Sequence, residues 1–320
     1  MSPIHAVTGA FGYSGQRIAA RLLAAGHPVR TLTNSPQPDH PLAPQLDIRP
    51  LSFNDPATLT QSLKDVDTLY NTYWVRFNHK TFSHAAAVQN TLALFRAAKS
   101  TGVRRIVHVS ITNPSEDSPF EYFRGKAHLE SALKSTHLSY AILRPAVLFG
   151  HHDILINNIA WILRKFPLFG VFGDGLYRLQ PIHVDDFASL AISLGQETAN
   201  ITIDAIGPET FTYRALVQEI ALLIRRPRPI ISIPPTLAYL IGRLAGLAVH
   251  DVVITRDEIA ALMANLLCTN SPPAGPTKLT DFARQHSDTL GLHYNSELAR
   301  RHSPRQTPAS PPLAPNSSVQ

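Results

Sequence analysis

The amino-acid sequence predicts an α/β fold, in which a doubly wound parallel sheet is followed by a smaller, mainly helical domain. Three observations support this prediction. Short β-rich runs alternate with helical runs through the first half of the 320-residue chain, which is the rhythm of a parallel sheet with helices on both faces. A glycine triplet separates the first expected strand from the first expected helix. The second half is less regular and contains mostly helical patterns.

The expected elements of the first half follow one another along the chain. Strands are expected at residues 4–8, 29–33, 67–72, 105–110 and 140–143, with a further strand near 50–53. Helices are expected at residues 14–25, 55–63, 81–100, 122–134 and 185–194. In the second half, helices are expected at residues 212–225, 236–248 and 257–267. The alternation predicts that the strands of the first half share one sheet.

These elements divide the chain into three expected parts. Residues 1–197 form the sheet domain, and residues 198–301 form a C-terminal substrate or cap domain to which residues 151–180 contribute. Residues 302–320 are rich in proline and serine and have almost no large apolar side chains. Such a segment buries too little surface to offset the entropy lost on ordering, so we expect a disordered tail.

The charge and cysteine content exclude several classes of protein. The net charge is +6 and the sequence pI is about 9.5, but the basic residues are scattered and not interleaved with aromatic residues, so we expect no nucleic-acid partner. The single cysteine, Cys268, permits no internal disulfide and fits a buried small hydrophobic residue. The segment His151–Asp153 has no third ligand at suitable spacing, so we expect a loop there and no metal site.

The N-terminus lacks a basic patch before a long apolar stretch, so no secretory signal is expected and the predicted location is cytoplasmic. The most apolar window, residues 236–254, is interrupted by Arg243, His250 and Asp251. It therefore leaves no clean span of about 20 apolar residues for a transmembrane segment. A buried or lid-forming helix is the preferred interpretation, and a helix lying on a membrane surface is the alternative.

The glycine triplet has the context of a phosphate-binding loop. Gly9, Gly12 and Gly15 follow the first strand in the spacing G-x-x-G-x-x-G and lead into a helix. The first glycine permits the tight turn, the second permits close approach of a pyrophosphate, and the third permits close helix–strand packing. The loop residues Ala10, Phe11 and Tyr13 are expected to contact the same ligand, because free N–H groups at the helix start favour phosphate. The sequence thus predicts a Rossmann-type domain that binds a dinucleotide.

The end of the second strand bears on the choice between NAD and NADP. NAD-specific sites place an acidic residue there to bind the ribose hydroxyls, but this chain has Asn34 at that point and no acidic residue before Asp39. Arg17, on the first helix, is a candidate partner for a 2′-phosphate. The cofactor is therefore expected to be NADP or NAD, with a slight preference for NADP.

A tyrosine and a lysine on one helix are the catalytic candidates. Tyr122 and Lys126 are four residues apart and so share a helix face. A neighbouring ammonium group lowers the pKa of a tyrosine, which suits Tyr122 to acid–base chemistry. Ser110 and Thr112 lie at the end of the preceding strand, two residues apart, and either is placed to bind a substrate oxygen. The alternative is that Tyr122 is an interfacial tyrosine of an amphipathic helix.

Taken together, these motifs resemble the extended or atypical short-chain dehydrogenase/reductase superfamily, close to its epimerase/dehydratase-like and NAD(P)H-binding members. The resemblance spans about residues 3–300, and further motifs that carry it are Leu69–Thr72, Leu143–Pro145, Phe149–Gly150 and Gln180–Asp186. It implies that Tyr122 is the acid–base and that Lys126 binds the ribose. It also implies that Asn71 and Thr72 lie along the cofactor and that Pro145 and Val147 line the nicotinamide.

Two function classes follow from the resemblance. The first is an NAD(P)-dependent oxidoreductase that transfers hydride at a carbonyl or alcohol carbon of a small-molecule substrate. Its chain is compatible with a homo-oligomer. Aromatic residues near Trp74 and Phe169 favour a partly apolar substrate. The second is a non-catalytic NAD(P)(H)-binding protein, a redox sensor or an assembly factor, as in relatives similar to an accessory subunit of respiratory complex I. Only nine residues separate Thr112 from Tyr122, which is shorter than in the sugar-nucleotide epimerases that the family includes.

Overall fold

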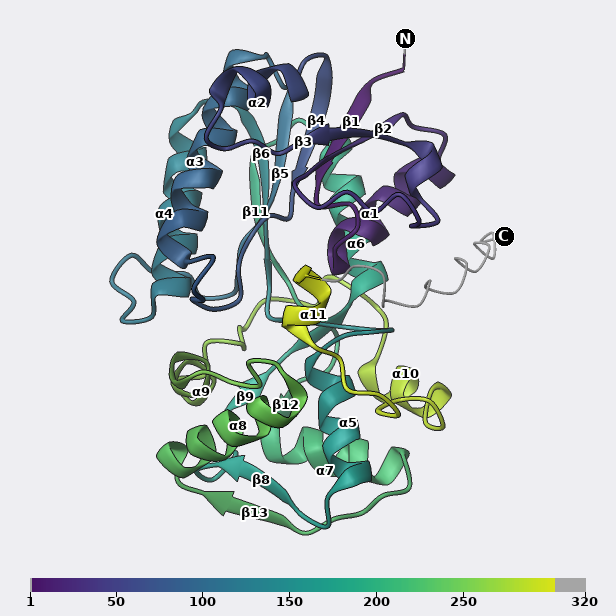
Figure 1. Ribbon diagram of the computed structural model, residues 1–320, viewed down its shortest axis with the longest axis vertical. Helices are drawn as coiled ribbons and strands as arrows, with labels where there is room; N and C mark the ends of the chain where they lie inside the picture. Colours follow the sequence, from purple (N-terminus) through teal and green to yellow (C-terminus); the bar gives the residue numbers. More distant parts are fainter. Residues whose placement is uncertain (1, 303–320) are drawn as a thin grey trace.

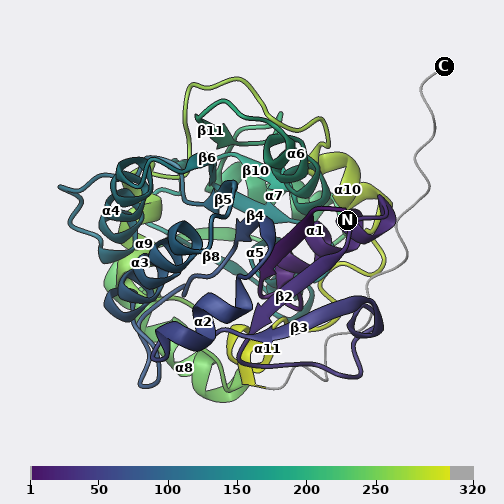
Figure 2. The ribbon, with the colours of Figure 1, turned by 90° about the horizontal axis from the view of Figure 1, so that it is seen from above.

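The computed structural model describes residues 2–302, and its centre is a seven-stranded sheet (Figures 1 and 2). The strands run in the order β11-β6-β5-β4-β1-β2-β3, and every neighbouring pair is parallel. Their bounds are β1 Ile4–Thr8, β2 Val29–Thr33, β3 Leu46–Pro50, β4 Val66–Asn71, β5 Arg105–Val109, β6 Ser139–Pro145 and β11 Ile201–Ala205. This confirms the predicted doubly wound α/β fold.

Helices cover both faces of the sheet (Figure 2). On one face lie α1 (Tyr13–Ala24) and α6 (Val184–Gln196), which contact each other. On the other lie α2 (Pro56–Ser62), α3 (His84–Ser100) and α4 (Glu121–Ser135). Each layer has its own core of fully buried side chains, including Leu22 and Phe187 in the first and Leu94 and Leu129 in the second. Burial of these apolar faces is what holds the helices on the sheet.

Local capping fixes two helix starts that the sequence placed only approximately. The Asp55 carboxylate accepts a hydrogen bond from Thr58 N and starts α2. The Ser83 hydroxyl accepts from Ala86 N, so α3 begins at His84, three residues later than expected. The third strand ends at Pro50, whereas the sequence analysis expected it near 50–53, and the edge strand β11 was not predicted.

The C-terminal part packs below the carboxyl ends of the strands (Figure 1). Its helices are α5 Leu155–Lys165, α7 Tyr213–Leu223, α8 Pro235–Val249, α9 Arg256–Met263 and α10 Leu279–Gln285. Three short strand pairs join them: β7 (Val147–Phe149) with β10 (Pro181–His183), β8 (Phe169–Phe172) with β13 (Ile230–Ile233), and β9 (Arg178–Leu179) with β12 (Phe211–Thr212). We call this C-terminal part the lower lobe, and the seven-stranded sheet with its covering helices the upper lobe. A 3₁₀ turn, η1 (Ala43–Gln45), lies in the upper lobe. The extra region is thus mainly helical, as predicted.

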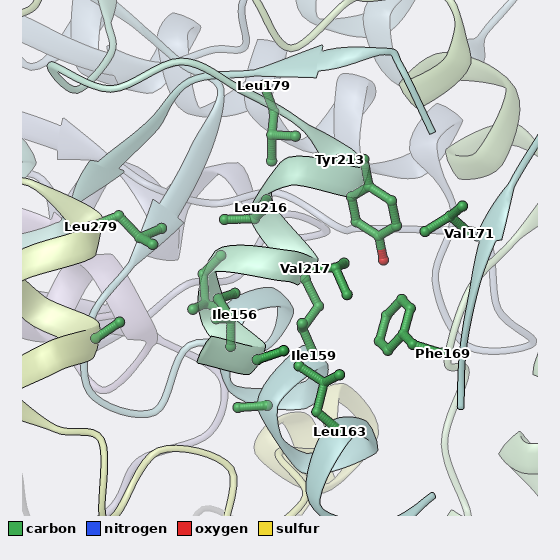
Figure 3. Packing of buried hydrophobic residues seen from close by; sticks show 14 of the residues in the cluster. Ile156, Ile159, Leu163, Phe169, Val171, Leu179, Tyr213, Leu216, Val217 and Leu279 are labelled. Atoms are coloured by element: carbon green, nitrogen blue, oxygen red, sulfur yellow. The ribbon is translucent and has the colours of Figure 1, made fainter. Parts of the chain in front are cut away.

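A separate apolar core organises this lower lobe. Figure 3 shows side chains of α5, α7 and β8 meeting there, among them Ile159, Leu216 and Phe169. The helix α8 contributes little to this core, because only Ala238, Gly242 and Gly246 of its residues are buried. The sequence analysis preferred a buried or lid-forming helix here, and the first interpretation is wrong: most of the large side chains of α8 are exposed.

The last described helix, α11 (Glu297–His302), returns to the space between the two lobes (Figure 1). The Asp251 carboxylate accepts hydrogen bonds from Glu297 N and Leu298 N and so holds its start. The tail expected from residue 302 lies outside the described residues, except for His302, which ends this helix. Within the described part of the chain, no helix has the length and apolar character needed to cross a bilayer.

Candidate functional site

The strands β1 and β4 are neighbours in the sheet although the chain leaves them toward opposite edges. Open α/β sheets bind their ligands at the carboxyl ends of such a strand pair, and we call this region the crevice. The Thr8 hydroxyl accepts hydrogen bonds from Thr72 N at 2.8 Å and Tyr73 N at 3.1 Å. It also lies 3.1 Å from Asn71 Oδ1, to which it donates. Asn71 and Thr72 therefore lie at the predicted crevice, but these hydrogen bonds tie β4 to β1, and Asn71 is fully buried.

The glycine loop forms one wall of the crevice. Gly9 has φ +68°, which an L side chain rarely adopts. A Cβ on Gly15 would lie 2.3 Å from Gly9 O, so only glycine allows α1 to pack this closely on the loop. Gly12 caps α1 without a side chain, and the first turn has no acidic residue. The amide groups of Tyr13 and its neighbours and the positive helix end thus remain available for an anion.

The other predicted loop residues have mainly supporting contacts. Ala10 N donates to the Thr31 hydroxyl at 3.1 Å, which fixes the loop against β2. The ring of Phe11 packs against His40 with centroids 5.1 Å apart. These contacts hold the loop open toward the crevice.

The end of β2 carries no charged partner for the cofactor ribose. Asn34 is exposed directly after the strand, and its Oδ1 accepts from Leu51 N at 3.2 Å. Arg17 is only 5% exposed and lies under α6, with its Nε 3.8 Å from Asp185 Oδ1. Arg17 is therefore buried against an acidic residue of α6, and its contact with a 2′-phosphate stays a prediction.

Lys126 lies beneath Trp74, one of the aromatic residues that the sequence analysis connected with the substrate and not with Lys126. Its Nζ donates to Val109 O at 2.7 Å and lies 4.2 Å from the centroid of the Trp74 ring. Lys126 is 1% exposed, and burial lowers its pKa to about 7, against an opposing effect of Glu130. Tyr122 is half-buried and packs edge-on against the same indole at 5.6 Å. The predicted pair thus shares a helix face, with Trp74 packed against both of its members.

Gly125 explains how Trp74 reaches this position. A Cβ at residue 125 would lie 3.1 Å from the indole Cη2 atom, so the absence of a side chain lets the ring lie flat on α4. Neither Trp74 nor Gly125 belongs to a sequence motif that predicts their contact. The contact forms because the β4–α3 loop approaches α4 in the folded chain.

The two candidate substrate hydroxyls have internal acceptors. The Ser110 hydroxyl donates to Glu130 Oε1 at 2.6 Å, and this carboxylate also accepts from Arg144 Nε at 2.9 Å. The Thr112 hydroxyl donates to Leu266 O at 2.8 Å. Ser110 is 2% exposed and Thr112 is 0% exposed. The structure therefore does not bring either hydroxyl together with Tyr122 in an open site.

The two residues predicted to line the nicotinamide lie where β6 of the sheet leads into β7. Pro145 ends β6, with its carbonyl accepting from Thr112 N at 3.1 Å, and Val147 begins β7 and packs on the lower core. The guanidinium of Arg300, on α11, lies 5.1 Å from the centroid of the Tyr13 ring and donates to His152 O. A half-buried cation from the C-terminal helix therefore lies beside the first residue of α1. The sequence analysis missed Arg300, because nothing in its local pattern indicates that α11 folds back.

A polar cavity of about 490 Å³ lies at the other edge of the sheet. Its lining includes Arg144 of β6, Asp204 of β11 and Cys268, which is half-buried instead of fully buried as expected. Because β6 and β11 are separated from β1 by β4 and β5, this cavity is not part of the crevice. Among the described residues, no group of three or more His, Cys, Asp or Glu side chains is arranged to hold a metal.

The aromatic residues that suggested an apolar substrate do not form one wall. Trp74 and Tyr73 pack on the core beneath α3 and α4. Phe169 and Phe172 belong to the core of the lower lobe, and Phe166 is exposed. These residues therefore do not form one apolar wall, and a partly apolar substrate stays a prediction.

Comparison with protein families identifies the glycine-loop domain. Residues 9–153 match the NAD(P)H-binding family model. This segment of the chain is therefore similar in sequence to NAD(P)H-binding domains. The cofactor class is thus NADP or NAD, as predicted.

The curated relatives include proteins of large complexes. The chain is 23% identical over 285 residues to the Arabidopsis thaliana mitochondrial NADH dehydrogenase [ubiquinone] 1 alpha subcomplex subunit 9, covering 83% of this chain and 71% of that protein. It is 24% identical to the photosystem II assembly factor Ycf39 of Guillardia theta over 81% of this chain and 86% of that protein. The matched segments span about half of several other relatives, for example 48% of the rat subunit 9. The predicted cytoplasmic location stays a prediction.

Solved structures of enzymes share the fold. Citrobacter triphenylmethane reductase complexed with NADP(H) superposes with a TM-score of 0.71 at 17% identity, covering 90% of this chain and 100% of that one. Escherichia coli NADPH-dependent quinone oxidoreductase QOR2 complexed with NADPH gives a TM-score of 0.70 at 18% identity, covering 88% and 99%. At such identities, these matches establish the fold and leave the chemistry to the residues of the site.

Proposed function

We propose that this chain is a dinucleotide-binding subunit that holds NADP(H) or NAD(H) without using Tyr122 as an acid–base catalyst. The observation that carries the proposal is the position of Lys126, which is hydrogen-bonded to Val109 O and covered by the Trp74 ring. A lysine in this position serves the packing of α4 on β5. It is not presented to a nicotinamide ribose.

The electrostatics of the site support the same function. A tyrosine becomes a general acid–base near neutral pH when a nearby ammonium group favours the phenolate. Burial lowers the pKa of Lys126 to about 7, so its positive charge is only partly present at that pH. The hydroxyls of Ser110 and Thr112 donate to Glu130 and to Leu266 O, which leaves no free serine or threonine donor of this pair for a substrate carbonyl.

In contrast to the catalytic candidates, the residues expected to bind the phosphates lie close to one another. The glycine loop, the uncapped start of α1 and the guanidinium of Arg300 lie together. We assign the pyrophosphate to this place, with Arg300 as its cationic partner. Because Asn34 neither repels nor pairs with a 2′-phosphate, we expect NADPH to bind at most a few-fold more tightly than NADH.

The relatives support a role as a subunit. Two of those that cover most of this chain are named as a subunit of NADH dehydrogenase and as a photosystem II assembly factor. We infer that the partner of this chain is a protein assembly, and that a small-molecule substrate is not required.

The deciding experiment measures binding and turnover in the same samples. Purified protein is first analysed for nucleotide carried through purification, then titrated with NADPH and NADH by fluorescence. Hydride exchange from deuterated NADPH into a panel of ketones, aldehydes and quinones is then followed for the wild type and Tyr122→Phe. We expect binding, and no exchange that depends on Tyr122. Loss of exchange in Tyr122→Phe by about a hundredfold or more, the size of effect of a general acid–base, contradicts the proposal.

A second candidate is the oxidoreductase itself, with Tyr122 transferring the proton. The observation that favours it is the retained Tyr122–Lys126 spacing on α4, with Tyr122 half-buried at the start of the helix. This function requires Trp74 to move away from Lys126 when the cofactor binds. It predicts that Trp74→Ala increases hydride exchange, whereas the subunit function predicts that this variant binds cofactor and remains inactive.

A further inference from the structure

The helix α8 presents its large apolar side chains outward. Leu237, Leu240, Ile241, Leu244 and Leu247 are 45–75% exposed. Their spacing of three and four residues places them on one face of the helix. A helix of a globular protein normally turns such a stripe toward the core, so this face is expected to have an apolar neighbour outside the chain.

The inward face of α8 is built from small residues. A Cβ on Gly242 would lie 2.9 Å from Ile254 Cγ2, and one on Gly246 would lie 2.5 Å from Asp251 O. These glycines let the backbone of α8 lie directly on the 251–254 segment. Because larger side chains at these positions would collide with that segment, the helix is held in the orientation that exposes its leucines.

Exposed apolar residues of neighbouring elements extend the surface. Figure 1 places α8 next to the β8–β13 pair at the lower end of the molecule, and α8 contacts β8. Ile231 of β13 is 42% exposed, and Phe166 and Leu168 in the α5–β8 connection are 48% and 45% exposed. We call α8 with these three residues the lower apolar surface.

The charged side chains of α8 and of the segment before it have one sign. Residues 225–249 contain four arginines and no acidic residue. Arg225, Arg226 and Arg243 are exposed, and so is Lys165 at the end of α5. Arg228 connects the segment 225–249 to α5, because its Nε donates to Leu163 O at 3.1 Å. An apolar face bordered by cations is complementary to the interface of an anionic lipid bilayer.

We propose that the lower apolar surface binds peripherally to anionic membranes, with α8 lying in the plane of the interface. At 15 residues and 1.5 Å per residue, α8 is about 22 Å long, shorter than the roughly 30 Å hydrocarbon layer. Its apolar stripe enters the headgroup and acyl boundary, and the arginines contact lipid phosphates. This surface is at the far end of the lower lobe from the glycine loop, so binding leaves the crevice accessible (Figure 1).

The charge distribution favours a bilayer over a second copy of the chain. A two-fold contact through α8 would place the same arginines of both copies around one interface. The segment 225–249 has no acidic residue to pair with them, so such a contact leaves the charges of these arginines uncompensated within the segment. A lipid surface provides the missing negative charge.

Co-sedimentation of the full chain with vesicles tests the proposal. We expect binding to vesicles of phosphatidylcholine with 30% phosphatidylglycerol (roughly the anionic content needed for a strong surface potential). Binding is expected to weaken in high salt, which screens the lipid charge. The double variant Leu244→Asp/Leu247→Asp should reduce binding at least about tenfold, and Arg225→Glu/Arg226→Glu several-fold. Ile48→Asp, on the exposed edge strand β3, is the matched control and should bind as the wild type does.

NADPH titration of each variant shows whether the fold is intact, since none of these residues lies at the crevice. Absence of binding to anionic vesicles by the wild type overturns the proposal. Equal binding to neutral phosphatidylcholine vesicles overturns the assignment to an anionic surface. Sedimentation velocity tests the alternative occupant, a second copy of the chain. If the wild type is a dimer that does not bind vesicles, and Leu244→Asp/Leu247→Asp is a monomer, the surface is a contact between two copies.

Discussion

Asp153 is a carboxyl group that the fold buries without an ion pair among the described residues. It is 1% exposed, and its Oδ1 accepts from Ile156 N at 2.7 Å at the start of α5. Its Oδ2 is buried without a hydrogen-bond partner in the described structure. Burial raises the pKa of Asp153 to about 7, against the smaller opposing effects of its backbone hydrogen bonds and Arg300. The folded state therefore favours the neutral acid.

This burial predicts a pH-dependent stability. A raised carboxyl pKa means that the folded protein loses stability as the pH rises from the ordinary value of 3.8 to about 7. Asp153→Asn keeps an acceptor for Ile156 N and removes the ionisation. We expect it to raise the free energy of unfolding at pH 8 by at most about 4 kcal/mol, at about 1.4 kcal/mol per pH unit. Thermal melts at pH 8 and pH 4.5 measure this, and an equal gain at both pH values contradicts it.

Gly15 is the glycine of the loop at which an added side chain would have the least space. Its Cβ would lie 2.3 Å from Gly9 O, so Gly15→Ala must move α1 away from the loop. We expect NADPH affinity to fall at least about tenfold, because the amide groups at the start of α1 then no longer meet the phosphates. Gln16→Ala, the next position on the same helix, is the control. Unchanged affinity in Gly15→Ala, measured by fluorescence titration, would show that the cofactor binds elsewhere.

The sequence pattern predicted the position and the conformation of the glycine loop. It did not predict the hydrogen-bond partners of the catalytic candidates. Glycine spacing is local and depends on φ angles and close approach, which a strand–loop–helix context determines. In contrast, the acceptor of the Thr112 hydroxyl is Leu266 O, 154 residues away. No local pattern shows such a partner, and the same holds for Trp74 over Lys126.

At the scale of elements, α9 connects the lobes through its capping residue. Glu258 Oε2 accepts from Thr255 N at 2.8 Å within a capping box. Its other oxygen, Oε1, lies 2.5 Å from Arg76 Nε, on the β4–α3 loop of the sheet domain. One carboxylate thus starts a helix of the lower lobe and binds the upper lobe.

Two substitutions separate these roles. Thr255→Ala should cost about 1 kcal/mol of stability through the lost cap. Glu258→Gln keeps an oxygen for capping and weakens the pairing with Arg76, which should cost about 1–3 kcal/mol because Arg76 is left partly buried without its counter-charge. Chemical denaturation of both variants and of Arg76→Lys/Glu258→Gln measures the coupling. If Glu258→Gln has no effect on stability in any background, Arg76 does not depend on this contact.

The elements themselves were largely predictable where apolar periodicity was long. The strands β1, β2, β4, β5 and β6 and the longer helices lie within a few residues of their expected bounds. The pairs β8–β13 and β9–β12 have two to four residues per strand and no periodicity to detect. They form because the surrounding helices bring them together.

At the scale of the whole molecule, α11 brings the last described residues next to the start of α1. Arg300 packs on Tyr13, and Asn295 Nδ2 donates to Asp153 O at 2.7 Å. The C-terminal helix thereby lies across the junction of the lobes beside the glycine loop (Figure 1). The proposed phosphate site therefore combines residues almost 300 positions apart along the chain.

We expect removal of this helix to weaken cofactor binding. Arg300→Ala should lower NADPH affinity about tenfold, the scale of one charge-assisted hydrogen bond. Truncation after Asn295 should do the same or more, and truncation after His302 is the matched control that retains α11. Calorimetric titration in low and high salt measures the loss. Equal affinity of all three variants and the wild type would show that α11 has no part in the phosphate site.

The two tryptophans of the chain lie in different lobes, one on each side of this junction. Trp74 covers Lys126 at the crevice, and Trp161 lies on α5 with its ring 5.2 Å from that of Tyr294. Their emission therefore gives two optical reporters in a chain that needs no added label. With Trp161→Phe, energy transfer to a reduced nicotinamide monitors the crevice alone. With Trp74→Phe, the remaining indole monitors the lower lobe, so ligand arrival and a response of the other lobe can be timed separately in one stopped-flow instrument.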